Sequence, residues 1–304
     1  MLTATLLLPD SGRLEGLALP PALGRALARG VIEHKRGGEA AQLRRHLSVL
    51  PDSEPLPVAA LTRQVDAGDA GREQWLRADP CFVAADMQGV RLLAHGPALA
   101  LTAEEAAAFA DELIPVFAER GLQFSAPDPS RWYLRLSGDT ELPALVPVDT
   151  VLGDDLFDHL PSGPSGRLWR SLLSDTQMLL HQLPINAKRQ AAGKAMVNSL
   201  WFLGAGTLPD QVRCIYGQIR SPDPLLQAVG QLSGRSDAQQ QLVDLRHVRD
   251  GQTLIDQALM PLVKALADGE LSCLQLDLAD GLCISMRRSQ RWHFWRRALT
   301  RFPK

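Results

Sequence analysis

The side chains best suited to chemistry in this sequence lie between His181 and Gly206. Four of them carry amide or cationic groups: Asn186, Arg189, Lys194 and Asn198. They come directly before the apolar run 199–203, which Gly204 and Gly206 follow. Glycines let a backbone approach a ligand closely, and amide and cationic groups bind carboxylate or phosphate oxygens. The pattern therefore predicts a site for an anionic or carboxylate-bearing ligand.

The same residue types also have a structural use. Asn and Arg side chains cap helix ends and brace the entry to a strand, and a Gly-x-Gly pair often ends a strand in a turn. The residues alone favour this structural use. Ligand binding becomes the better interpretation only with the family resemblance described below.

The first segment of the chain predicts the opening of an α/β sheet. The apolar run 4–8 is typical of a buried strand, and the polar turn after it contains Asp10. A helix over 20–30 follows, with Gly30 as its C-terminal cap. Ligands of α/β proteins gather at the carboxyl ends of strands, so Asp10 is the one candidate catalytic residue.

The middle of the chain predicts a small α+β module. Runs at 81–84 and 90–94 flank a turn and predict a hairpin, and Thr102 with Glu105 forms a capping-box pattern that starts a helix. A second strand pair is expected at 122–124 and 131–136. Two arginines near strand starts of this module are further candidates for contact with an anion, or else lie on solvated strand edges: Arg77 and Arg135.

The C-terminal part alternates again between strand and helix patterns. Strands are expected near 212–216 and 242, and helices at 225–232 and 253–267, the latter kinked at Pro261. The closing hairpin is expected to pair 271–278 with 283–286.

Arginines and aromatic residues are interleaved near the C-terminus, in a segment that could meet nucleic acid, a membrane surface or a partner. Its candidate residues are Arg287, Arg288, Arg291, Trp292, Trp295, Arg296 and Arg297. The alternative is a final element whose tryptophans pack on the core while the arginines extend to solvent. The overall net charge of −2 favours this second interpretation over nucleic-acid binding.

Composition is typical of a soluble globular protein. The 304 residues are 45% hydrophobic and 22% charged, and no apolar run approaches the length of a membrane span. The four cysteines are scattered and form no metal-ligand pattern, which is typical of reduced thiols. We therefore expect a cytoplasmic protein.

The segment that begins at His181 resembles the archaeal-type, cofactor-independent phosphoglycerate mutases of the alkaline phosphatase superfamily. Their pattern is close to HPVN-x-x-R-x-x-x-G-K-x-P-A-N, followed by an apolar strand and G-x-G. The residues in register with it are His181, Pro184, Asn186, Arg189, Gly193, Lys194, Asn198, Gly204 and Gly206. Over its whole length the chain is also similar to bacterial proteins described as RpfE-type regulatory proteins, through motifs such as WLRADP at 75–80 and RWYLRL at 131–136.

The resemblance implies an α/β fold: an alkaline-phosphatase-like sheet with helices on both faces, interrupted by a smaller α+β domain. The implied boundaries are 1–64 and 151–304 for the main domain and 65–150 for the inserted one.

The departure from the family concerns the metal site. The active mutases hold two divalent metals on clustered Asp and His ligands beside a serine nucleophile. Asp10 stands where the first ligand aspartate would be, but no histidine follows the strand end at 276–281. No metal or other cofactor is therefore expected.

These features together favour a catalytically degenerate mutase relative. It would act as a regulatory or ligand-sensing protein, with an anionic small molecule or a protein as its partner. One alternative is an active mutase or phosphatase that uses Mn or Zn. The other is a nucleic-acid-binding regulator that uses the C-terminal arginines and tryptophans.

Overall fold

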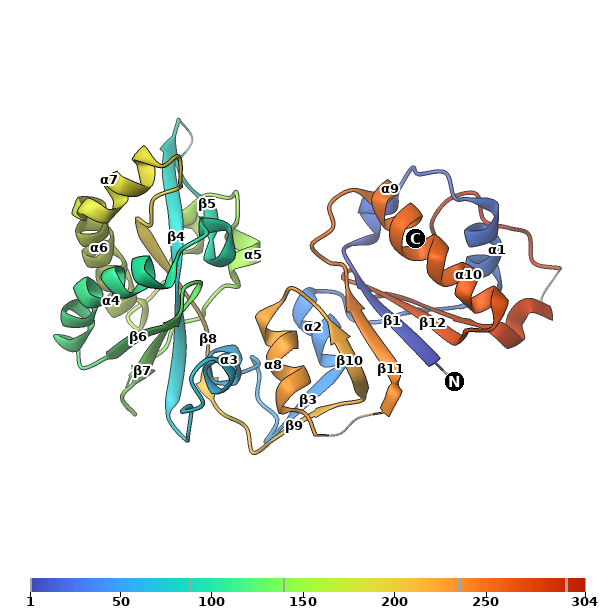
Figure 1. The fold of residues 1–304 in the computed structure, drawn as a ribbon, viewed down its shortest axis with the longest axis horizontal. Coiled ribbons are helices and arrows are strands. Elements are labelled where there is room, and N and C mark those ends of the chain that lie inside the picture. Colours follow the sequence, from blue (N-terminus) through green and yellow to red (C-terminus); the bar gives the residue numbers. More distant parts are fainter. Residues whose placement is uncertain (1, 88, 139, 235–236, 293–294, 304) are drawn as a thin grey trace. The chain divides into compact units, whose positions relative to one another are not determined.

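The computed structural model describes residues 2–87, 89–138, 140–234, 237–292 and 295–303. It divides into two compact units (Figure 1). The terminal unit comprises residues 1–52 and 210–304, and the middle unit comprises 53–209. Among the described residues, no helix is long and apolar enough to span a membrane.

The terminal unit is built on a six-stranded sheet in the order β10-β11-β1-β12-β13-β2. The first four strands run parallel to their neighbours, and β13 and β2 are antiparallel. The strands are β1 (Leu2–Leu8), β2 (Val31–His34), β10 (Tyr216–Arg220), β11 (Asp237–Asp244), β12 (Leu271–Leu278) and β13 (Leu282–Arg287). A separate two-stranded sheet pairs β3 (Leu47–Leu50) with β9 (Gln211–Cys214).

Helices cover both faces of the six-stranded sheet. On β1, Leu6 and Leu8 face one side and Leu7 the other, and all three are fully buried. The helices of this unit are α1 (Pro21–Arg29), α2 (Glu39–Arg44), α8 (Pro224–Leu232), α9 (Gly251–Thr253) and α10 (Met260–Asp268). Leu6 and Leu8 pack in one core with residues of α1 and α10. Gly230 of α8 lies against Ile219, whose register partner Leu242 faces away from that core, so α8 covers the opposite face.

The helical region before β12 is interrupted as Pro261 predicts. A π-helical turn at Leu254–Leu259 lies between α9 and α10, and Pro261 occupies the first turn of α10. Proline has no backbone N–H to donate, so it is tolerated in a first turn but not in a helix interior. The predicted hairpin that follows is confirmed as β12 and β13.

The middle unit is built on a five-stranded antiparallel sheet in which β4 pairs with β5, β7 and β8, and β7 pairs with β6. The strands are β4 (Gln74–Asp86), β5 (Gly89–His95), β6 (Gln123–Asp128), β7 (Arg131–Leu136) and β8 (Ser199–Thr207). The helices are α3 (Val58–Asp66), α4 (Ala103–Ala118), α5 (Val148–Val151), α6 (Gly166–Gln182) and α7 (Pro184–Ala191). The predicted hairpin, capping box and second strand pair are all confirmed.

One face of this sheet packs against α4 and α6. Trp132 and Leu134 of β7 lie in one core with Phe109 of α4 and Trp169 of α6, and all four are fully buried. The other face carries Trp75 and Tyr133 and packs with residues of α3. The mixed α/β class predicted from the sequence is confirmed.

The compact middle unit extends well beyond the inserted domain expected at 65–150. The reason lies in β8, which was assigned to the main domain but pairs with β4 from Gln74 to Cys81. Without β8 that edge of β4 would expose unpaired backbone groups. Helix α6 packs with α4 and β8, and α3 packs on β4 and β8, so residues 53–64 and 151–209 belong to the same unit.

Candidate functional site

The carboxyl edge of the parallel strands in the terminal unit brings several aspartates together. Asp244 ends β11 and Asp277 lies near the end of β12, and both are register partners of Leu7 on β1. Asp10 follows β1 in the same region of the sheet. Open α/β sheets bind their ligands outside this edge, so it is the first place to look for a site.

Asp277 is held by cationic and imidazole groups of the chain itself. Arg45 donates two hydrogen bonds to its carboxylate, at 2.8 and 2.5 Å, and His46 Nε2 donates a third at 2.7 Å. Burial opposes ionisation of Asp277, but these hydrogen bonds outweigh it and hold the pKa of the carboxyl below its usual value. Both carboxylate oxygens therefore already have charged or polar partners.

His46 also links Asp277 to a buried tyrosine. Its Nδ1 lies 2.6 Å from the hydroxyl of Tyr216 on β10. Burial raises the pKa of Tyr216 to about 12, so its hydroxyl stays protonated at neutral pH. The hydrogen-bonded series Asp277–His46–Tyr216 links β12 and β10 through the residue that directly precedes β3.

Asp244 is neutralised in the same way. Arg246 donates to its two oxygens at 2.9 and 2.8 Å, and Ser221 Oγ donates at 2.7 Å. Arg246 also donates to Asp223, at 2.7 Å. Burial opposes ionisation of Asp244, but the hydrogen bonds from Arg246 and Ser221 keep its pKa lowered.

Asp10, the candidate catalytic residue, caps a short helix. Its Oδ1 accepts a hydrogen bond from the backbone N–H of Gly12 at 2.8 Å, at the start of the 3₁₀ helix Ser11–Leu14. The hydroxyl of Ser11 donates to Asp280 rather than to Asp10. The exposed carboxylate of Asp10 is near the strand edge, and its hydrogen bond with Gly12 is local.

A two-metal site does not fit these residues. Such a site needs several carboxylates and imidazoles that converge on ions about 3.5–4 Å apart. Within the described ranges, no group of three or more His, Cys, Asp or Glu side chains could hold a metal ion. The buried carboxylates at the strand ends instead share their oxygens with Arg45 and Arg246.

The predicted ligand-binding residues after His181 lie in and after α7, in the middle unit. Asn186 donates to the carbonyls of Leu180 and Val197, at 2.7 and 2.8 Å, and accepts from Val197 N at 2.9 Å. Asn198 Oδ1 accepts a hydrogen bond from the backbone N–H of Val83 at 2.8 Å, and Asn198 Nδ2 donates one to the carbonyl of Val83 at 2.7 Å. These amides join the end of α6 and the start of β8 to neighbouring backbone.

Arg189 is only 1% exposed and is fully engaged. Its guanidinium donates to Glu105 at 2.6 Å and to the carbonyls of Ala195 and Leu99 at 2.9 and 2.6 Å. Lys194 lies 3.7 Å from the same glutamate and is partly exposed. Glu105 thus joins the capping box of α4 to this segment.

Gly204 and Gly206 allow the start of α3 to approach β8. A Cβ on Gly204 would lie 2.7 Å from Cβ of Val58, and one on Gly206 would lie 2.5 Å from Cβ of Pro57. Gly204 also has a positive φ of 66°. The sequence predicts that these glycines approach a ligand; in the structure they approach the start of α3, and ligand binding stays a prediction.

The two arginines of the central strands differ. Arg77 is buried and donates to Asp79, two residues along β4. Arg135 on β7 instead lines a polar cavity. Arg135 is one of the eight predicted ligand-binding residues, and ligand binding by all eight stays a prediction.

The C-terminal segment exposes its tryptophans. The side chains of Trp292 and Trp295 are 64% and 67% exposed. Arg296 donates to the carbonyls of Ala28 and Gly30, both at 3.1 Å, which ties the segment to the end of α1. The Arg291 side chain and residues 293 and 294 lie outside the described part of the chain.

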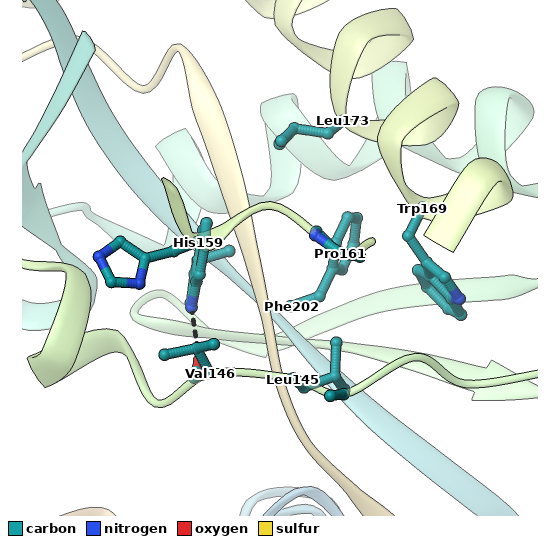
Figure 2. A pocket seen from close by; sticks show the side chains of 9 residues that line it. Leu145, Val146, His159, Pro161, Trp169, Leu173 and Phe202 are labelled. Atoms are coloured by element: carbon teal, nitrogen blue, oxygen red, sulfur yellow. Dashed lines mark hydrogen bonds between the residues drawn. The ribbon is translucent and has the colours of Figure 1, made fainter. Parts of the chain in front are cut away.

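A second cavity, lined by aromatic and aliphatic residues, is too small for a ligand. Figure 2 shows His159, Trp169 and Phe202 around it. Its volume of about 10 Å³ holds at most one water molecule. His159 is held by Asp154 at 2.9 Å.

Sequence reasoning missed the role of Arg45 and His46. Helix α2 ends at Arg44, and the side chains of Arg45 and His46 turn toward Asp277. An aspartate at the end of an apolar strand was the available signal, because a buried carboxylate requires a partner.

No family model matches the chain. The 2,3-bisphosphoglycerate-independent phosphoglycerate mutase of Methanothrix thermoacetophila is 29% identical over 94 residues, which are 29% of this chain and 24% of the relative. The mutase of Methanosarcina acetivorans is 31% identical over 104 residues, 33% of this chain and 25% of the relative. That part of the chain is distantly homologous to these mutases.

The chain spans about a quarter of the length of the curated relatives that it matches. Among solved structures, the cofactor-independent phosphoglycerate mutase of Thermoplasma acidophilum is similar with a TM-score of 0.40 and 16% identity. That similarity covers 94% of this chain and 90% of the mutase.

Proposed function

We propose that this chain is a catalytically degenerate phosphoglycerate mutase-like protein that acts as a regulatory or ligand-sensing protein in the cytoplasm. The observation that carries the proposal is the state of the strand-end carboxylates in the terminal unit. Asp277 and Asp244 are bound by Arg45 and Arg246 of the same chain. In a metal-dependent mutase or phosphatase, carboxylates at such an edge would have to be available to cations.

The energetics of these ion pairs support the proposal. A divalent cation that took Asp277 as a ligand would compete with Arg45 and His46 for the same oxygens. Breaking a buried pair and leaving one charge uncompensated costs about 3–5 kcal/mol. Arg45 and His46 thus already bind the carboxylate oxygens that a cation would need as ligands.

Turnover with manganese tests the proposal. The purified full-length protein, incubated with Mn²⁺ and 3-phosphoglycerate, is expected to give no turnover above the buffer background. The active-enzyme alternative predicts robust turnover that Asp10→Ala abolishes. The matched control is Asp158→Ala, which removes a carboxylate from the 3₁₀ helix Leu156–His159 in the other unit. Turnover lost in the first variant and kept in the second would refute the degenerate assignment.

A nucleic-acid-binding regulator is the second candidate, favoured by the exposed Trp292 and Trp295 beside Arg297. Stacking on tryptophan and phosphate contacts from arginine would give salt-dependent binding to single strands. The variant Trp292→Ala/Trp295→Ala should then lose binding in a fluorescence-anisotropy titration. Binding that is unchanged in this variant would reject the candidate.

A further inference from the structure

A polar cavity lies on one face of the middle-unit sheet. Its volume is about 170 Å³. It is lined by Arg63, Asp69, Trp75, Gln123, Phe124, Ser125 and Arg135. All of these residues belong to the middle unit, so the cavity is complete within one compact body.

The sheet register explains why polar side chains gather here. Arg135 on β7 is the register partner of Trp75 on β4 and of Gln123 on β6. Residues directly opposite one another in an antiparallel sheet project from the same face. These three side chains therefore form a row across neighbouring strands, and Ser125, two residues beyond Gln123, adds a hydroxyl to the same face.

One side of the cavity is fixed by Arg63 of α3. Its guanidinium donates to both oxygens of Asp69, at 2.6 and 2.7 Å, and to Ser125 Oγ at 2.8 Å. It also lies over the ring of Trp75, 4.5 Å from the centroid. The hydrogen bonds from Arg63 lower the pKa of Asp69, so this carboxylate is charged and already paired.

Arg135 carries the second guanidinium of the lining, and its charge adds to that of Arg63 in lowering the pKa of the Asp69 carboxyl. Within the described ranges, no carboxylate lies within ion-pair distance of its guanidinium, and no hydrogen bond holds it. The nearby Arg131 is different, because it donates to Asp66 and Asp128. With Arg63 matched by Asp69, the lining carries one positive charge in excess, and it belongs to Arg135.

We propose that this cavity binds a small anion that carries a phosphate or carboxylate group, with Arg135 as its main anchor. A planar guanidinium presents paired N–H donors that match two oxygens of either group. Gln123 adds an amide, and the lining is preorganised because Arg63 and Trp75 are fixed by their own contacts. The inference rests on the ligand-sensing part of the proposed function and gives that ligand a chemical class and a location.

Isothermal titration of the full-length protein with inorganic phosphate, and separately with succinate, tests the proposal at low ionic strength. One site per chain is expected for at least one of the two anions. Arg135→Gln should weaken this binding by at least about tenfold, because it removes a charged donor. The matched control Arg72→Gln removes an exposed arginine of the same unit and should leave the affinity unchanged.

A second variant tests the same site in case Arg135→Gln does not fold. Gln123→Glu adds a negative charge to the exposed rim of the cavity without removing an internal contact, and it should also weaken anion binding. Circular dichroism and urea unfolding should be the same for all variants.

Each outcome has a defined meaning. Tighter binding of phosphate assigns a phosphate-bearing ligand, and tighter binding of succinate assigns a carboxylate. The absence of saturable binding for both anions, or binding that Arg135→Gln leaves unchanged, would overturn the proposal. Because this titration involves neither manganese nor turnover, its failure is distinct from failure of the mutase-like assignment.

Discussion

At the scale of single residues, side-chain type was predictable but the partner was not. Asn186 and Arg189 were predicted as ligand groups because amides and guanidiniums bind anions, yet both donate to backbone carbonyls near the start of β8. A buried backbone carbonyl needs a donor as much as a ligand oxygen does. The sequence does not distinguish these two acceptors, because both are oxygen atoms that accept from the same donors. One of the carbonyls, that of Leu99, is also distant from Arg189 in the chain.

The ion pair between Arg45 and Asp277 should be important for stability. Asp277→Asn would leave the guanidinium largely desolvated without a countercharge, and we expect the free energy of unfolding to fall by about 3–5 kcal/mol. Urea titration monitored by circular dichroism measures the change. The control is Asp52→Asn, whose carboxylate also binds an arginine but is 79% exposed. Its loss should lie below about 1 kcal/mol, and equal losses in both variants would contradict the structural role of Asp277.

The lowered pKa values of Asp277 and Asp244 predict a loss of stability in acid. Burial opposes ionisation of each group, but the hydrogen bonds from arginine lower both pKa values in the folded protein. An unfolded aspartate titrates near about 3.9. Stabilisation from these groups is therefore fully present above that pH and is lost as the pH falls through the lower folded values.

Urea titrations between about pH 6 and pH 3 check this dependence. The free energy of unfolding should fall toward the acid end, and it should fall less steeply in Asp244→Asn, which has one fewer carboxylate to protonate. An identical slope in the variant and the parent protein would show that Asp244 does not contribute.

At the scale of elements, local signals predicted most of the strands and helices. The hairpin of β12 and β13 and the capping box of α4 depend on residues close in sequence, and both are present. The segment at Pro184–Ala191 was treated as a run of ligand groups, but it forms α7, with Pro184 in its first turn. The pairing of β8 with β4 was not predicted, because it joins residues more than a hundred positions apart.

The contact between α3 and β8 gives Gly204 a testable role. Gly204→Ala would place a methyl group 2.7 Å from Cβ of Val58 at a φ of 66°, so we expect a destabilisation of about 1–3 kcal/mol. Gly138→Ala, in a loop of the same unit where a Cβ meets no atom within 4 Å, is the control. The midpoint of thermal unfolding should be clearly lower for Gly204→Ala than for Gly138→Ala. Similar midpoints would show that the absence of a side chain at Gly204 is not needed for packing.

At the scale of the whole molecule, the resemblance to the mutases predicted the α/β class and helices on both sheet faces. It did not predict the unit boundaries, because edge pairing of β4 and packing of α6 decide them. A fragment of residues 53–209 should therefore unfold cooperatively on heating, since it keeps the whole sheet and core. A fragment of 65–150 lacks β8 and α6 and should show no cooperative transition. If the two fragments unfold with equal cooperativity, the result would favour 65–150 as the independent domain.

We propose that arginines of this chain, rather than metal ions, neutralise the carboxylates at the strand ends of the terminal unit. Elemental analysis of the full-length protein, purified without chelators and then equilibrated with Mn²⁺ and desalted, tests it most directly. Manganese and zinc are expected at far below one ion per chain. One or two tightly held ions per chain, lost on substitution of Asp10 or Asp277, would contradict it.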